Sequence, residues 1–330
     1  MTTYLSRSST PSGLSPDYTD QDVGLARLDS ASPTVSTAPP PYDDAPASNT
    51  TFHPTVHLQI EAPGKPWFSF PGPPRPDPIP IFTLHPDDSS AATASTSTPT
   101  FISNRPERSS GSCYLVAAST PTTPLATTTY RFGPNRPARM RLYHPHTTPA
   151  ISTTHLHALV KDEPVDGEAE VEPWDDFPLN PLGLLTRALG FRTRLGTFEW
   201  RYASRKERHA LSEKSGEEIS SLLVLERVVR VATAQNQPGG GRKGEEQVRT
   251  TVARFLRGPG YRTSGSGAST AGNGGRLVMD LGLWEAEGGD KGEREMARAL
   301  VTATCLTMLK KEVDRRRAQQ IAVIAGAVSG

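Results

Sequence analysis

A helix-forming segment near the C-terminus constrains the fold of this 330-residue chain more than any other feature. Residues 293 to about 318 contain no Gly or Pro and are rich in Ala, Leu, Met, Glu, Lys and Arg, which predicts one long helix. No residue between 299 and 309 is charged, and apolar side chains lie on opposite sides of the helix. Such a helix belongs inside a core, so the rest of the chain has to form walls around it.

Short segments that alternate apolar and polar residues are the candidates for these walls, because a period of two is typical of half-buried strands. The clearest is the one in which Phe198, Trp200 and Tyr202 share one face. A short helix is predicted at 181–189. About ten strands around one buried helix predict a mostly β fold, a closed or nearly closed antiparallel barrel around a hydrophobic C-terminal α-helix. The other predicted strands are 56–60, 67–70, 79–84, 113–117, 128–132, 139–144, 155–160, 222–231, 248–256 and 276–284.

The composition of the first fifty residues sets them apart from this domain. They contain 23 Ser, Thr or Pro and six Leu or Val, with no Ile or Phe. Such a segment cannot bury enough apolar surface to offset its ordering entropy. We therefore predict a disordered tail over residues 1–52, a single β domain over 53–318 and a short apolar extension over 319–330. Long mobile loops are expected at about 162–176, 236–246 and 258–275, which are acidic or Gly-rich.

Three short patterns resemble a known class of barrels. They are the strand Phe198-Glu199-Trp200-Arg201, the strand Val252-Ala253-Arg254-Phe255 and the helix over 299–311. Together with the element order over 55–318, they resemble the tubby C-terminal and LURP-one-like class, to which phospholipid scramblases are related, and in particular its uncharacterised fungal members. The resemblance implies a closed sheet around the helix and a binding or membrane-associated module. Tubby domains bind phosphoinositide head groups through basic side chains, but no such position carries over to this sequence.

The predicted tail contains one docking motif. Pro39, Pro40 and Tyr42 match the PPxY ligand of WW domains, in which a preformed polyproline helix docks on aromatic grooves. A WW-domain protein such as a ubiquitin ligase is the partner that this motif predicts. A chance match in a Pro-rich segment is the equal alternative.

A run of basic residues follows the apolar part of the C-terminal helix, and an apolar segment over 321–328 follows the run. Together they are candidate contacts to an anionic lipid surface, where each basic side chain adds about 1 kcal/mol. The competing interpretation is that Lys and Arg near a helix C-terminus complement its dipole. The candidate lipid contacts are Lys310, Lys311, Arg315, Arg316 and Arg317.

The net charge and the two cysteines limit which partners and which cellular compartment we expect for this protein. The chain has 36 basic and 35 acidic residues, so nothing in its net charge favours nucleic acid. The first residues lack the apolar run of a signal peptide, and no apolar run approaches the ~20 residues that span a bilayer. Cys113 and Cys305 have no metal-ligand spacing. These features predict a cytoplasmic protein that is not transmembrane and has no cofactor, and the basic run described above leaves a peripheral location at membranes as an open alternative.

No catalytic residue can be assigned from spacing alone. The preferred interpretation is therefore a non-catalytic intracellular binding or scaffold module. The alternative is a metal-assisted hydrolase in which His155 and His157 lie at i and i+2 on one face of a strand. The Gly-rich segments 239–244 and 265–275 lack a phosphate-binding pattern and fit hairpin loops better.

Overall fold

The computed structural model describes most of the chain beyond its first fifty residues. Predictions that concern residues 1–50, including Pro39, Pro40 and Tyr42 of the PPxY motif, lie outside the described residues. The same holds for much of the predicted loops at 162–176 and 236–246. The described ranges are 51–72, 77–84, 98–108, 110–130, 136–163, 171–183, 186–233, 244–286 and 291–328.

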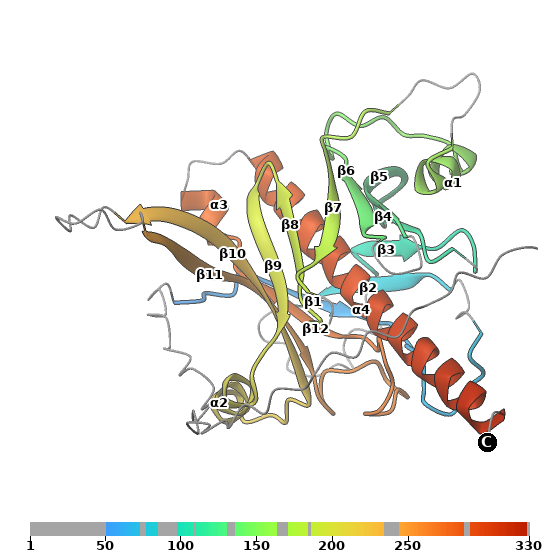
Figure 1. The fold of residues 1–330 in the computed structure, drawn as a ribbon. Coiled ribbons are helices and arrows are strands. Elements are labelled where there is room, and N and C mark those ends of the chain that lie inside the picture. The colour runs from blue at the N-terminus through green and yellow to red at the C-terminus, as the bar shows by residue number, and fades with distance from the viewer. Residues whose placement is uncertain are drawn as a thin grey trace, which may run out of the picture. The chain divides into compact units, whose positions relative to one another are not determined.

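Twelve described strands form one closed antiparallel barrel (Figure 1). Each strand pairs with its neighbours in sequence, and the first strand closes the sheet by pairing with the last, with Val56 opposite Met279 and Ile60 opposite Gly275. The strands are β1 Val56–Ile60, β2 Ile79–Leu84, β3 Phe101–Asn104, β4 Cys113–Ala117, β5 Thr120–Thr129, β6 Ala138–Leu142, β7 Asp175–Pro181, β8 Leu189–Thr193, β9 Gly196–Tyr202, β10 Ser221–Thr233, β11 Gly244–Arg257 and β12 Gly275–Met279.

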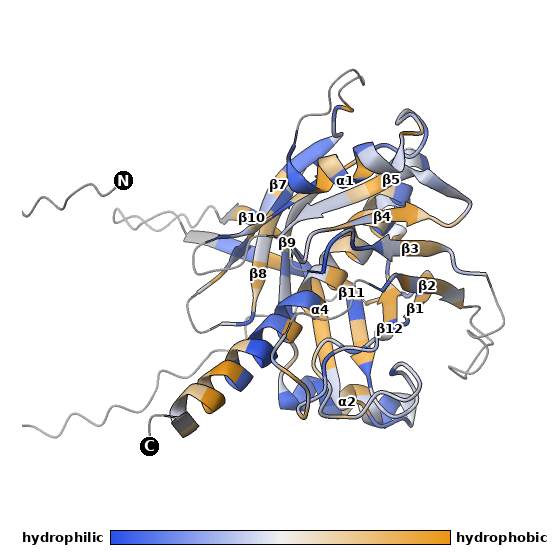
Figure 2. Ribbon diagram, turned by 90° about the vertical axis from the view of Figure 1, so that its right-hand side faces the viewer, coloured by the Kyte–Doolittle hydropathy of each residue, from blue (hydrophilic) through white to orange (hydrophobic). Residues whose placement is uncertain are grey.

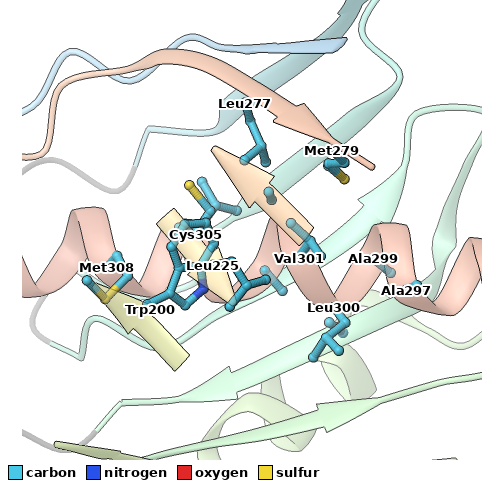
Figure 3. Close-up of a cluster of buried hydrophobic side chains, with 14 of the residues drawn as sticks. Trp200, Leu225, Leu277, Met279, Ala297, Ala299, Leu300, Val301, Cys305 and Met308 are labelled. Carbon is cyan, nitrogen blue, oxygen red and sulfur yellow. The ribbon is translucent and has the colours of Figure 1, made fainter. Parts of the chain in front are cut away.

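The C-terminal helix α4, Lys291–Val328, passes along the inside of this barrel. Every residue from 299 to 309 is buried, and the inward side chains of the strands pack against them, as Figure 3 shows for Trp200, Leu225, Leu277 and Met279. The predicted barrel around an apolar helix is thereby confirmed.

Three threonines in this buried stretch would each bring an unpaired hydroxyl into the core. Each hydroxyl instead donates to the backbone carbonyl four residues earlier: Thr302 to Arg298, Thr304 to Leu300 and Thr307 to Ala303. The oxygen of Thr304 also accepts a hydrogen bond from the Trp200 indole at 3.0 Å, which ties the helix to β9. Polar residues are therefore compatible with an uncharged, fully buried helix.

One end of the barrel is filled by aromatic side chains. The short helix α3, Gly282–Ala286, places Trp284 6.4 Å from Phe198, measured between ring centroids. Phe198 stacks in turn on Phe191 at 5.5 Å, and Phe191 on Phe177 at 5.6 Å. Offset stacking at these separations adds to the free energy gained by burying the rings.

Three helices occur where no helix was predicted, and one of them is the short α3, since the strand predicted over 276–284 ends at Met279. The strand prediction for 155–160 is wrong: helix α1, Thr153–Lys161, begins at Ser152, whose hydroxyl accepts from the His155 amide, and ends at Asp162 with a φ of 65°. Its Leu156 and Val160 pack on the outer face of β4. Helix α2, Arg205–Ser215, begins at a capping box between Ser204 and Glu207.

Three other predictions differ from the structure. The helix predicted at 181–189 is absent from the described part of that segment, and Leu189 instead begins β8. The segment 67–70 forms bends and not a strand. Helix α4 continues to Val328 and does not end near 318, because the apolar segment over 321–328 extends it. The helix is therefore longer than the barrel that encloses it.

Candidate functional site

The candidate site is the end of the barrel from which α4 emerges, which we call the barrel mouth. The five basic residues predicted to contact lipid all lie here, since continuous burial of the helix ends at Leu309 and Lys310 is the first partly exposed residue. Beyond this point hydrophilic and hydrophobic turns alternate along the projecting helix, and hydrophobic residues gather near its end (Figure 2).

The acidic residue Glu312 does not neutralise this basic cluster, because its carboxylate forms an ion pair with Arg257 of β11. Two guanidinium nitrogens of Arg257 donate to the two carboxylate oxygens of Glu312 at 2.7 and 2.6 Å. The Tyr202 hydroxyl and the Gly272 amide also donate to this carboxylate. Burial acts to raise the pKa of Glu312, but the hydrogen bonds and charge of Arg257 outweigh it, so the net shift of the pKa is downward.

The second acidic residue, Asp314, is paired within the helix. The Lys310 ammonium donates to its carboxylate one turn along and lies 4.9 Å above the Tyr130 ring. The Lys310 side chain is only 13 % exposed. Lys310 is therefore mainly a structural partner at the mouth, and Lys311, Arg315, Arg316 and Arg317 are the basic residues of the cluster that lie further toward solvent.

The connection between β1 and β2 lies directly against the emerging helix. The Arg316 guanidinium lies 4.5 Å above the Trp67 ring. The Gln320 amide donates to the Trp67 carbonyl at 2.5 Å and also reaches the Pro66 carbonyl at 3.4 Å. These contacts join two segments that are about 250 residues apart in sequence.

This connection presents two aromatic side chains to solvent, and we call residues 66–70 the aromatic loop. Phe68 is 95 % exposed and Phe70 is 92 % exposed. The loop is held from below by the buried Lys65, whose ammonium donates to the Phe70 carbonyl at 2.5 Å and to the Gly72 carbonyl at 3.1 Å. These hydrogen bonds fix the backbone beside the exposed rings.

The projecting end of α4 adds a second exposed apolar group next to the aromatic loop. Ile321, Val323 and Ile324 follow directly after Gln320, which is bonded to the loop, and Val323 is 61 % exposed. Large exposed apolar side chains that gather next to one another mark an interaction surface, whereas scattered ones do not. The barrel mouth therefore combines basic, aromatic and aliphatic groups on one surface.

The basic residues and the apolar end of α4 form a local run that the sequence predicts as a candidate lipid contact. The aromatic loop could not be predicted in this way, because its alternating residues over 67–70 favour a strand. The buried Lys65 and the distant Gln320 that shape the loop give no local signal.

The two histidines proposed as metal ligands do not form a shared site. Both belong to helix α1, where residues two apart point in different directions. His155 is buried, whereas His157 lies with its ring 6.2 Å from that of Tyr114. Within the described ranges, no group of three or more His, Cys, Asp or Glu side chains is arranged to hold a metal ion.

The pair between Arg257 and Glu312 makes a testable contribution to stability. Glu312→Gln would keep the shape of the side chain but leave Arg257 buried without its counter-charge, which costs about 3–5 kcal/mol. We expect a correspondingly lower free energy of unfolding at pH 7, measured by urea titration. Glu107→Gln, which removes a partner of the surface residue Lys161, is the matched control and should leave the midpoint unchanged.

The difference between Glu312→Gln and the wild type should also depend on pH. Because the folded state lowers the pKa of Glu312, its stabilisation is present above the ordinary glutamate pKa of about 4.3. It is lost as the pH falls through the lower folded pKa. A variant that unfolds at the same urea concentration as the wild type at pH 7 would contradict the role given to this pair.

Comparison with known proteins does not identify this chain, since no protein-family model, curated protein or solved structure matches it. The resemblance to the tubby C-terminal and LURP-one-like class therefore rests on this chain's own strands and helix. The barrel mouth is therefore the feature that bears most directly on function.

Proposed function

We propose that this protein is a non-catalytic binding module that associates peripherally with an anionic membrane surface through its barrel mouth. The observation that carries the proposal is the contact between the aromatic loop and the emerging helix. Through Trp67 it joins the loop that carries Phe68 and Phe70 to Arg316 of the basic cluster and to Gln320, directly before the apolar residues Ile321 to Ile324. A lipid surface matches both parts, because its interior accepts apolar side chains and its anionic head groups attract basic ones.

The free energies expected from the apolar and the basic residues are large enough together for binding to a membrane surface. Fully burying a Phe side chain contributes about 1.5–3 kcal/mol, and each basic residue near an anionic surface adds about 1 kcal/mol. A single weak anchor gives only marginal, reversible binding. Two phenylalanines together with several basic residues exceed that level.

We propose that the barrel mouth rests on the membrane surface and does not cross the bilayer. Among the described helices, none carries an apolar stretch long enough to cross a bilayer. The basic residues over 310–317 of α4 lie between its buried stretch and its apolar end, so they would sit at the level of the head groups when the end enters the interface.

We retain membership of the tubby C-terminal and LURP-one-like class as a proposal. The closed barrel of sequential antiparallel strands around a C-terminal helix supports it. We also propose a cytoplasmic location, peripheral at membranes. The free thiols of Cys113 and Cys305 support that compartment.

The aromatic loop gives a direct test of the proposed membrane contact. Phe68→Ser with Phe70→Ser should weaken sedimentation with vesicles of phosphatidylcholine and phosphatidylserine at least about tenfold, because the burial of both rings is lost. Thermal unfolding should not change, since both side chains are almost fully exposed. Binding by the wild type should weaken as salt is raised, because exposed charges are screened beyond about 10 Å at 0.1 M.

A matched control is available on β10, which exposes Val229 at 45 % and Val231 at 43 %. The double change Val229→Ser with Val231→Ser removes two exposed apolar side chains away from the mouth and should leave sedimentation intact. The proposal would fail if the wild type did not sediment with these vesicles, or if both double variants bound equally.

We further propose that the PPxY motif recruits a WW-domain protein, so that the barrel serves as a scaffold between a membrane and that partner. Tyr42→Ala should abolish pull-down by isolated WW domains, because the tyrosine is the anchor of the motif. The melting temperature of the protein should stay the same. Retention of the Tyr42→Ala variant on WW domains would remove this part of the proposal.

A further inference from the structure

The barrel mouth contains a cavity of about 470 Å³ between α4 and the connection from β1 to β2. Its lining includes four apolar side chains, those of Ile79, Leu306, Leu309 and Val313. It also includes four basic residues, Lys65, Arg105, Arg108 and Lys310. Asp77 is the one carboxylate among the described residues that line the cavity. The cavity is therefore amphipathic, with an excess of positive charge.

The positive charges around this cavity repel one another. Burial lowers the pKa of the Lys65 ammonium, and the charges of Arg317 and Arg108 lower it further. Burial also lowers the pKa of Lys310, and Arg105 and Arg317 act in the same direction against the opposing effect of Asp314. An anion bound among these side chains would relieve the repulsion.

Arg105 is the basic residue best placed to bind such an anion. Its guanidinium forms no hydrogen bond or ion pair with any residue that the structure describes, and its Nε is buried without a partner. A buried donor without a partner costs free energy until a ligand or water satisfies it. A planar guanidinium suits the oxygens of a phosphate or carboxylate group.

A smaller hollow that shares Arg105, Leu306 and Lys310 with the cavity reaches Cys113 and Tyr130. Pockets for small molecules commonly have volumes of about 300–1,000 Å³, with apolar walls and a few placed polar groups. The cavity thus has the size of a site for a small amphipathic molecule and a lining that contains both apolar and basic residues.

We propose that this cavity binds one molecule of an anionic amphiphile, with a phosphate head group against Arg105, Arg108 and Lys65 and an apolar chain along Leu306, Leu309 and Val313. The phosphate presents several oxygens to a surround of several cations, which favours it over a neutral polar head group. This inference goes beyond surface association, because a single dissolved molecule should bind without any bilayer.

Calorimetric titration with octyl phosphate, kept below its micelle concentration, tests the site in the full-length protein. Inorganic phosphate supplies the head group alone and octyl glucoside supplies the chain with a neutral head group. Octyl phosphate should bind at least about tenfold more tightly than either. Equal binding of inorganic phosphate would reduce the cavity to a simple anion site, and equal binding of octyl glucoside would remove the role of charge; either result overturns the proposal.

Two variants with opposite expected effects on affinity test whether octyl phosphate binds in this cavity. Arg105→Gln should weaken octyl phosphate binding about tenfold or more, because a charge-assisted hydrogen bond is lost, whereas Asp77→Asn should tighten it by removing repulsion. Arg205→Gln on the surface of α2 is the matched control and should bind like the wild type. Unchanged affinity in both cavity variants would contradict the assignment. Because no vesicle is used, failure here and failure of the membrane proposal remain distinguishable.

Discussion

The enclosure of residues 299–309 of α4 by the barrel is the interaction on which the rest of the structure depends. Twelve described strands close into a barrel whose interior is filled by one helix, and the inward side chains of these strands pack in one core with that helix. The hydrogen bond from Trp200 to Thr304 adds a specific contact to this non-directional burial. Burial of the helix thus determines both the closure of the sheet and the position at which α4 emerges.

The barrel mouth follows from a helix that is longer than its enclosure. At 38 residues, α4 extends well past the last buried turn, and the change from core to surface takes place within two turns. Two ion pairs lie at that boundary. Glu312 pairs with Arg257, and Asp314 pairs with Lys310. With these acids paired, the remaining basic residues can act on partners outside the barrel. The aromatic loop then adds apolar groups that the helix alone could not provide.

The parts of the fold that depend on periodicity could be predicted from the sequence. The strand 79–84 and the buried helix were placed correctly, because alternation and the absence of charge report burial directly. Helix α2 was missed although Ser204 and Glu207 form a capping box that the sequence displays. Helix α1 was interpreted as a strand because His155, His157 and Leu156 alternate polar and apolar over a short segment.

The site was less predictable than the fold, because its residues come from distant segments. The basic residues of α4 and its apolar end could be found as a local run. By contrast, Lys65, Arg105 and Leu309 meet around one cavity only after the barrel closes. The backbone of the aromatic loop accepts hydrogen bonds from Lys65 and Gln320, and neither residue is identified by spacing or composition.

Hydrogen–deuterium exchange with and without anionic vesicles tests the central claim, that the barrel mouth is the membrane-facing surface, most directly. We expect slower exchange on vesicles in the segments 65–72 and 315–328, where the aromatic loop and the projecting end of α4 lie together. Exchange in the strands β10 and β11 should stay as it is in solution. Protection that appears in those strands, or that is absent from both segments of the mouth while the protein is bound, would contradict the account.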